Sequence, residues 1–244
     1  MCIRDRAYEA WSEIMSGGPL VQSAAVRRRK LNAADYRKIG DWIGQQLRKH
    51  DVWVVLMPSG QSNTPFVRGL EHAVDWPIVF INERQILFVD MKTPQGKELF
   101  EGMFNGQTIY PDDFSKYLAL AHNMLIFGKE EDAKKQGLDF AIRACRDNPS
   151  QVSILKVISA RRFPELLPAV NDFCKGYVDD YVENMTDYAK MHGFHRRTLA
   201  ALRAAEHLQE IARNQKDAEL ARFYADKKKD FGDELSEMLK TKRW

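Results

Sequence analysis

Apolar residues recur at helical intervals in the first well-defined element of the chain. Between residues 33 and 49 they stand three or four positions apart, which places them on one face of a helix. These residues are Tyr36, Ile39, Ile43 and Leu47. Asn32 stands immediately before them and has a side chain typical of an N-cap. The pattern predicts a helix over residues 33–49, preceded by a short helix over residues 7–15 and a loose basic stretch.

Five apolar runs predict buried strands, because they are rich in β-branched and aromatic residues and are bounded by turn-forming residues. They are Val52–Met57, Trp76–Ile81, Gln85–Lys92, Met124–Gly128 and Val152–Ser159. Only the turn Asn82-Glu83-Arg84 separates the second run from the third. We therefore expect these two strands to form a hairpin.

The segments between and after these runs predict helices and one loop. Helices are expected from Asp112 or Asp113 to His122 and from Glu130 to Arg146. The glycine-containing stretch from Gly96 to Gly106 is expected to be a loop. After Pro164 the apolar residues recur only at helical spacing.

This order of elements predicts an α/β fold with a mixed sheet of about five strands flanked by helices, because a helix between two strands requires a crossover. The expected domains are an N-terminal tail (1–30), an α/β domain (31–163) and an all-helical C-terminal segment (164–244). The first six residues, MCIRDR, resemble a translated sequencing-adapter scar, so they are left out of the fold prediction.

Composition and charge narrow the class of protein only slightly. Hydrophobic residues make up 44% and charged residues 29% of the chain, as in ordinary soluble proteins. No apolar run approaches the roughly 20 residues that cross a bilayer, and no secretory leader is evident, so we expect a cytoplasmic protein without a membrane partner. The three cysteines are far apart, which suits a reducing compartment. The net charge is only +3, but basic clusters such as Arg27–Lys30 and Lys227–Lys229 are available for phosphate contacts, with solvated surfaces as the alternative.

Two acids and a lysine are expected to meet at one edge of the sheet. In ILFVDMKTP (residues 86–94), Asp90 and Lys92 point to the same side of a strand, about 6–7 Å apart along it. Asp75 begins the preceding strand, and Asp75 and Asp90 are about equally far from the hairpin turn, so antiparallel pairing brings them together. Carboxylate oxygens are the ligands that Mg²⁺ prefers. A metal there would activate a water, and Lys92 would position that water or stabilise the charge developing on a phosphate.

Asp75 followed by Asp90-Met91-Lys92 on a strand–turn–strand resembles the PD-(D/E)xK nuclease superfamily, and within it the VRR-NUC and Holliday-junction-resolvase proteins. The resemblance covers residues 33–130. It implies a restriction-endonuclease-like fold and a nuclease that uses Mg²⁺ or Mn²⁺ and acts on DNA rather than RNA, with a homodimer left open. It also implies Asp75 and Asp90 as metal ligands, Met91 as a further ligand and Lys92 as the catalytic lysine.

Several other residues are candidates for supporting roles. Asp41 and Glu71 are candidates for an additional acid, because many members of the superfamily carry one on the first helix. His192 and His195 are three positions apart, as in a helical metal pair, but no third ligand has metal spacing nearby. We expect phosphate contacts from Ser59, Gly60, Lys116, Arg196 and Arg197.

Two alternatives to a nuclease remain open at this point. The first is a catalytically inactive nuclease-like module that binds nucleic acid or another protein. The second is an unrelated α/β protein in which Asp90 and Lys92 form only a surface ion pair. The positions of three side chains distinguish the nuclease from the second alternative. A nuclease site requires Asp75, Asp90 and Lys92 to converge, whereas a surface ion pair does not.

Overall fold

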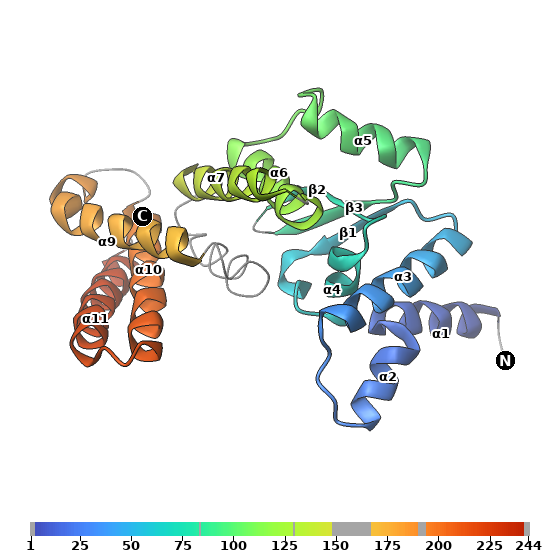
Figure 1. Ribbon diagram of the computed structural model, residues 1–244, viewed down its shortest axis with the longest axis horizontal. Coiled ribbons are helices and arrows are strands. Elements are labelled where there is room, and N and C mark those ends of the chain that lie inside the picture. The colour runs from blue at the N-terminus through green and yellow to red at the C-terminus, as the bar shows by residue number, and fades with distance from the viewer. Residues whose placement is uncertain (1–2, 83, 129, 148–166, 190–193, 242–244) are drawn as a thin grey trace. The chain divides into compact units, whose positions relative to one another are not determined.

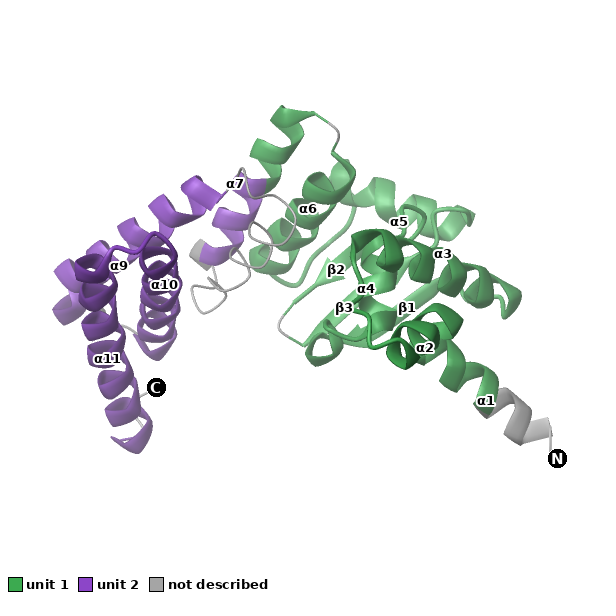
Figure 2. Cartoon of the chain, turned by 60° about the horizontal axis from the view of Figure 1, so that its bottom comes forward, with its two compact units in different colours: residues 1–137 green, residues 138–244 purple. Residues whose placement is uncertain are grey.

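The computed structural model describes residues 3–82, 84–128, 130–147, 167–189 and 194–241 (Figure 1). The chain divides into two compact units, residues 1–137 and 138–244 (Figure 2). No helix within the described ranges has both the length and the apolar character required to cross a bilayer.

The first unit begins with two helices, α1 (Ile3–Ser16) and α2 (Gly18–Val26). The sequence predicted a helix in the region of α1 but a loose stretch in place of α2. Ala24 of α2 is buried, and Leu20 and Val21 pack against the hydrophobic core. The second helix forms because Pro19 suits a first helical turn and because its apolar side chains find a core to cover.

The helix α3 (Ala33–Lys49) confirms the prediction for this segment. Asn32 caps it, since Asn32 Oδ1 accepts a hydrogen bond from Asp35 N at 3.0 Å and Asp35 Oδ2 accepts one from Asn32 N at 2.9 Å. Arg29 binds the same carboxyl group at 2.6 Å. The hydrogen bonds from Arg29 are the largest cause that lowers the pKa of Asp35 to about 2, so the cap is charged at neutral pH.

The strands form one antiparallel sheet in the order β1-β3-β2. They are β1 (Val54–Pro58), β2 (Ile78–Ile81) and β3 (Gln85–Val89). The predicted hairpin of β2 and β3 is confirmed, with Ile81 opposite Ile86 next to the turn. Between β1 and β2 the chain forms the 3₁₀ turn η1 (Ser59–Gln61) and the helix α4 (Pro65–His72), which the sequence analysis did not predict.

The expected mixed sheet of about five strands is wrong. Over the residues that the structure describes, the sheet has three strands, all antiparallel, and helices predominate. The expected strand Met124–Gly128 is instead the end of helix α6 (Asp113–Phe127). A short apolar run has the same composition in a buried helix as in a buried strand, and α6 is buried against β2. The remaining expected strand, Val152–Ser159, lies outside the described residues.

The loop expected from Gly96 to Gly106 is also wrong, because α5 (Pro94–Phe104) occupies most of it. Thr93 caps this helix through its Oγ1, which accepts a hydrogen bond from Gly96 N at 3.2 Å, and Pro94 starts the first turn. The helix predicted from Glu130 to Arg146 is present as α7 (Glu131–Asp147).

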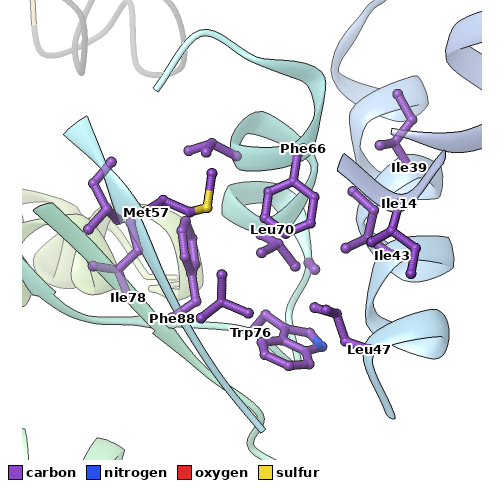
Figure 3. Close-up of a cluster of buried hydrophobic side chains, with 14 of the residues drawn as sticks. Ile14, Ile39, Ile43, Leu47, Met57, Phe66, Leu70, Trp76, Ile78 and Phe88 are labelled. Atoms are coloured by element: carbon purple, nitrogen blue, oxygen red, sulfur yellow. The ribbon is translucent and has the colours of Figure 1, made fainter. Parts of the chain in front are cut away.

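The core of the first unit lies between the sheet and the helices α3 and α4 (Figure 3). Its side chains include Ile39, Ile43, Leu47, Met57, Phe66, Leu70, Trp76, Ile78 and Phe88. Gly40 and Gly69 let the two helices approach closely, since a Cβ on Gly40 would lie 2.1 Å from the Gly69 carbonyl oxygen. This packing holds the last turn of α3 near the strand ends, while α6 covers the opposite face of the sheet (Figure 1).

The second unit includes the end of α7 from Leu138 onward, followed by the helices α9 (Leu167–Tyr188), α10 (Phe194–Asn214) and α11 (Ala218–Thr241). They confirm the predicted all-helical C-terminal extension. The central helix α10 packs against both α9 and α11, and its buried face is built largely of alanines. Small side chains on this face allow the three helices to lie close together.

Candidate functional site

The hairpin brings the two predicted acids to the same end of the sheet. The expected strands are too long at this end, because β2 begins at Ile78 and β3 ends at Val89. Asp75 stands three residues before β2, Asp90 directly follows β3, and Lys92 lies in a turn and not on a strand. The pairing continues past the strands, because Val89 N donates a hydrogen bond to Pro77 O at 3.2 Å and Met91 N donates one to Asp75 O at 2.9 Å. The two acids therefore lie next to each other in space although 15 positions separate them in the sequence.

Arg48 connects the two carboxyl groups. It belongs to the last turn of α3, and its guanidinium binds Asp90 through two hydrogen bonds, Nε to Oδ2 at 2.6 Å and Nη2 to Oδ1 at 2.7 Å. The same Nη2 lies 3.3 Å from Asp75 Oδ2. This forked geometry is the strong form of an arginine–carboxylate pair.

Asp90 is charged although its side chain is only 1% exposed. Burial acts to raise the pKa of its carboxyl group, but hydrogen bonds from Arg48 and from the backbone N–H of Lys92 outweigh burial and hold the pKa below its usual range. The hydrogen bonds to Asp90 are also the largest cause that raises the pKa of Arg48. The pair is thus ionised at neutral pH, as a buried acid with a cationic partner should be.

Lys92 lies on the solvent side of the same cluster. Its Nζ is 2.5 Å from Asp75 Oδ2, and the side chains of Lys92 and Asp75 are 59% and 41% exposed. An ion pair this exposed adds little to the free energy of unfolding. Lys92 therefore has an amine that is positioned but open to solvent, which is what contact with a substrate requires.

The N-terminus of α5 holds the backbone of the cluster in place. Thr93 Oγ1 donates a hydrogen bond to Asp90 O at 2.8 Å. Gly96 packs directly on the same carbonyl group, since a Cβ on Gly96 would lie 2.1 Å from Asp90 O. The turn from Asp90 to Lys92 is consequently fixed from both sides, by the backbone of Asp75 and by the start of α5.

The structure brings together Asp75, Asp90 and Lys92 from the sequence prediction and adds Arg48 to them. Met91 lies between Asp90 and Lys92, where its N–H binds Asp75 O. Asp41 is exposed on α3, seven residues or roughly 10 Å along the helix before Arg48, so it stands apart from the cluster.

The other predicted residues lie in separate elements of the chain. Glu71 is half-buried in α4. His195 is in α10, and His192 lies outside the described residues. The expected phosphate contacts are distributed over η1 (Ser59, Gly60), α6 (Lys116) and, in the second unit, α10 (Arg196, Arg197).

Sequence reasoning missed Arg48, and two signals pointed to it. A buried carboxylate requires a cationic partner, and the sequence already placed Asp90 at the end of a buried strand. Arg48 directly follows Leu47, the last apolar residue of the helical stripe, so it lies at the border of the face that packs on the sheet. Together, these two features indicate Arg48 as the partner of Asp90.

The carboxylate oxygens of the cluster are of the chemical type that binds a divalent cation. Mg²⁺ is commonly held by one or two carboxylates together with substrate phosphates and water. Asp75 and Asp90 supply two carboxylates, and the position of Arg48 Nη2 shows that one cationic group reaches both. The described part of the chain contains no group of three His, Cys, Asp or Glu side chains arranged to hold a metal. A divalent cation bound there would have these two carboxylates as its protein ligands.

No protein-family model matches this chain, and neither a curated protein nor a solved structure matches it. Any function must accordingly follow from the chemistry of the site.

Proposed function

We propose that this chain is a metal-dependent nuclease that hydrolyses phosphodiester bonds of nucleic acid, DNA in preference to RNA, at the cluster of Asp75, Asp90 and Lys92. The observation that carries this proposal is the convergence of two carboxylates and an amine at one end of the hairpin. The resemblance to PD-(D/E)xK nucleases supports it through this hairpin and its charged residues, and not through the size of the sheet.

Each residue has a distinct role in the proposed reaction. Asp75 and Asp90 hold Mg²⁺ or Mn²⁺, which when bound polarises a phosphate oxygen and lowers the pKa of a bound water. Lys92 positions the attacking water or stabilises the negative charge that develops on the phosphate. Thr93 and Gly96 keep Asp90 and Lys92 at a fixed spacing.

A cleavage assay with the full chain tests this proposal. Single- and double-stranded DNA and RNA are incubated with Mg²⁺ or Mn²⁺, and Lys92→Ala is compared with Lys97→Ala. Lys97 is a matched control, because it is also an exposed lysine paired with an acid, Glu101. We expect Lys92→Ala to lower the cleavage rate on the order of a hundredfold or more, and Lys97→Ala to leave it close to that of the wild type.

Two outcomes of this assay contradict the proposal. The first is that the wild-type chain cleaves none of these substrates with either metal. The second is that the two lysine variants lower the rate equally, since Lys92 would then contribute only a surface charge.

A second candidate is the non-catalytic module that binds nucleic acid or protein. The observation that favours it is the forked pair of Arg48 and Asp90, which together with Lys92 and Asp75 forms a cluster of zero net charge. Such a cluster has the features of a structural ion-pair network. For this candidate we expect no cleavage, and retention of nucleic acid in a gel-shift assay that Lys92→Ala does not change.

A further inference from the structure

We propose that Arg48 competes with the divalent cation for the carboxylate oxygens of Asp75 and Asp90, so that the guanidinium and the metal occupy the site alternately. This inference rests on the proposed nuclease function, because it concerns the same two carboxylates. It assigns to Arg48 the role of a positioning residue that keeps the site closed until a metal displaces it.

The Arg48 guanidinium and the metal ion would bind the same carboxylate oxygens. Arg48 engages both oxygens of Asp90, and its Nη2 also approaches Asp75 Oδ2. Asp90 Oδ1 additionally accepts the hydrogen bond from Lys92 N at 3.0 Å. Three of about four acceptor positions on the Asp90 carboxylate are thus taken, and a metal cannot bind between the two acids while the guanidinium stays there.

The charges of the cluster favour exchange over joint occupancy. With Arg48 in place, two carboxylates balance two cationic side chains. A divalent ion added to this set would leave a charge of +2 among groups a few ångströms apart. If Arg48 withdraws, the same ion leaves only +1, and each carboxylate keeps a cationic partner.

Arg48 has a route away from the carboxylates. Its side chain is 27% exposed and comes from the last turn of α3, so its guanidinium can turn to water without a change in the core. In the closed arrangement the guanidinium carbon lies 5.9 Å from the centre of the Trp76 ring. The contacts that define the closed state are therefore these two acids and one ring.

Calorimetry of Mn²⁺ binding to the full chain tests the competition. If Arg48 occupies the two carboxylates nine-tenths of the time, the apparent affinity for the metal is about tenfold lower than that of the site without Arg48. We expect Arg48→Gln to bind Mn²⁺ about tenfold more tightly than the wild type. Lys92→Gln controls for charge, because it removes one positive charge from the cluster but leaves Arg48 on Asp90. Arg29→Gln controls for a remote loss of an arginine–carboxylate pair and should bind Mn²⁺ like the wild type.

A variant that lacks Arg48 leaves Asp90 buried without its main partner, so its folding is measured with and without metal. Thermal unfolding with and without Mn²⁺ covers this case, because Mn²⁺ should raise the melting temperature of Arg48→Gln by more than that of the wild type. If Arg48→Gln does not fold under either condition, Arg48→Lys replaces it. A lysine cannot bind both oxygens of Asp90 as a fork, so this variant must also bind Mn²⁺ more tightly than the wild type.

The results separate this inference from the proposed function. The competition is overturned if the Arg48 variant binds Mn²⁺ no more tightly than the wild type, or no more tightly than Lys92→Gln. If the wild type nevertheless binds Mn²⁺ and cleaves nucleic acid, the nuclease proposal stands without the competition. If neither the wild type nor the Arg48 variant binds Mn²⁺, both the metal site and the competition are refuted.

Discussion

Asp90 shows how a single residue depends on the groups that the fold places around it. Its carboxyl group is nearly inaccessible to solvent, yet it is held in the charged form by Arg48. Removing one partner of a buried ion pair typically costs about 3–5 kcal/mol, because the remaining charge is left without compensation. Loss of either partner is therefore expected to destabilise the chain, and under the proposed competition the same pair would control access to the Asp90 carboxylate.

At the residue scale, Gly96 provides a test of the geometry around Asp90. A Cβ on Gly96 would meet the Asp90 carbonyl oxygen at 2.1 Å. The carbonyl belongs to the backbone and the Cβ is fixed directly on Cα, so neither can turn aside by rotating a side chain. We expect Gly96→Ala to lower the free energy of unfolding by about 1–3 kcal/mol. Urea unfolding followed by tryptophan fluorescence measures this change in the first unit, which holds Trp11, Trp42, Trp53 and Trp76.

Gly60→Ala is the control for this experiment. Gly60 lies in η1, and a Cβ there would have nothing within 4 Å. We expect it to change the free energy of unfolding by no more than about 0.5 kcal/mol. Equal effects of the two substitutions would contradict the close contact of α5 with Asp90.

At the scale of elements, each unit is held together by contacts between particular helices and strands. In the first unit, α3 and α4 pack on one side of the sheet, and α6 packs on β2. Asn123 of α6 joins these layers, since its Nδ2 donates to Ile78 O at 2.6 Å.

In the second unit, Tyr181 of α9 has the corresponding role between helices. Its hydroxyl donates to Glu234 Oε2 of α11 at 2.9 Å and lies 2.7 Å from Thr198 Oγ1 of α10.

We expect Tyr181→Phe to weaken the packing of these three helices. The substitution keeps the aromatic ring, which contacts Phe194 and Phe231, but removes the hydroxyl group that joins Thr198 to Glu234. The predicted loss in the free energy of unfolding is about 1–2 kcal/mol, since the partners remain partly buried without this bond. Chemical denaturation monitored by circular dichroism measures it. Glu237→Gln, on an exposed position of α11, should change the stability little, and a comparable loss there would argue against the role of the hydroxyl group.

At the scale of the whole molecule, the two units have separate cores. The buried residues of the first unit come mainly from α3, α4, α6 and the sheet, and those of the second come mainly from α9, α10 and α11. The candidate site lies entirely within the first unit. The division implies that the proposed chemistry and the helical extension are distinct parts of the protein.

We therefore expect residues 167–244, expressed alone, to fold into a helical domain. The contacts of α10 with α9 and with α11 are all retained in this fragment. Circular dichroism should show a helical spectrum that is lost in a cooperative thermal transition. A fragment with Tyr181→Phe should melt at a lower temperature. A spectrum typical of an unfolded chain would show that these helices need the rest of the protein.

The fold was only partly predictable, for reasons that particular elements make clear. α3 was predicted with its bounds, because its cap and its apolar stripe are local signals. Met124–Gly128 reads as a strand in the sequence, because a short apolar run does not reveal its period, and only the packing of α6 on β2 makes its first four residues helical. α5 was missed because its glycines suggested a loop, although Gly96 is required by the close approach to Asp90.

The candidate site divides in the same way between sequence and tertiary structure. The sequence alone indicated that Asp75 and Asp90 would meet, because the turn of a hairpin is a local signal. The strand expected to place Asp90 and Lys92 on one side ends at Val89, and both residues lie beyond it in the turn that leads into α5. Only the tertiary structure decided that Arg48 would join them. Arg48 is 42 positions from Asp90, and no local rule links a helix end to a strand end at that separation. The packing of α3 on α4 and the sheet, together with the requirement that a buried carboxylate be paired, brings the guanidinium to the two acids.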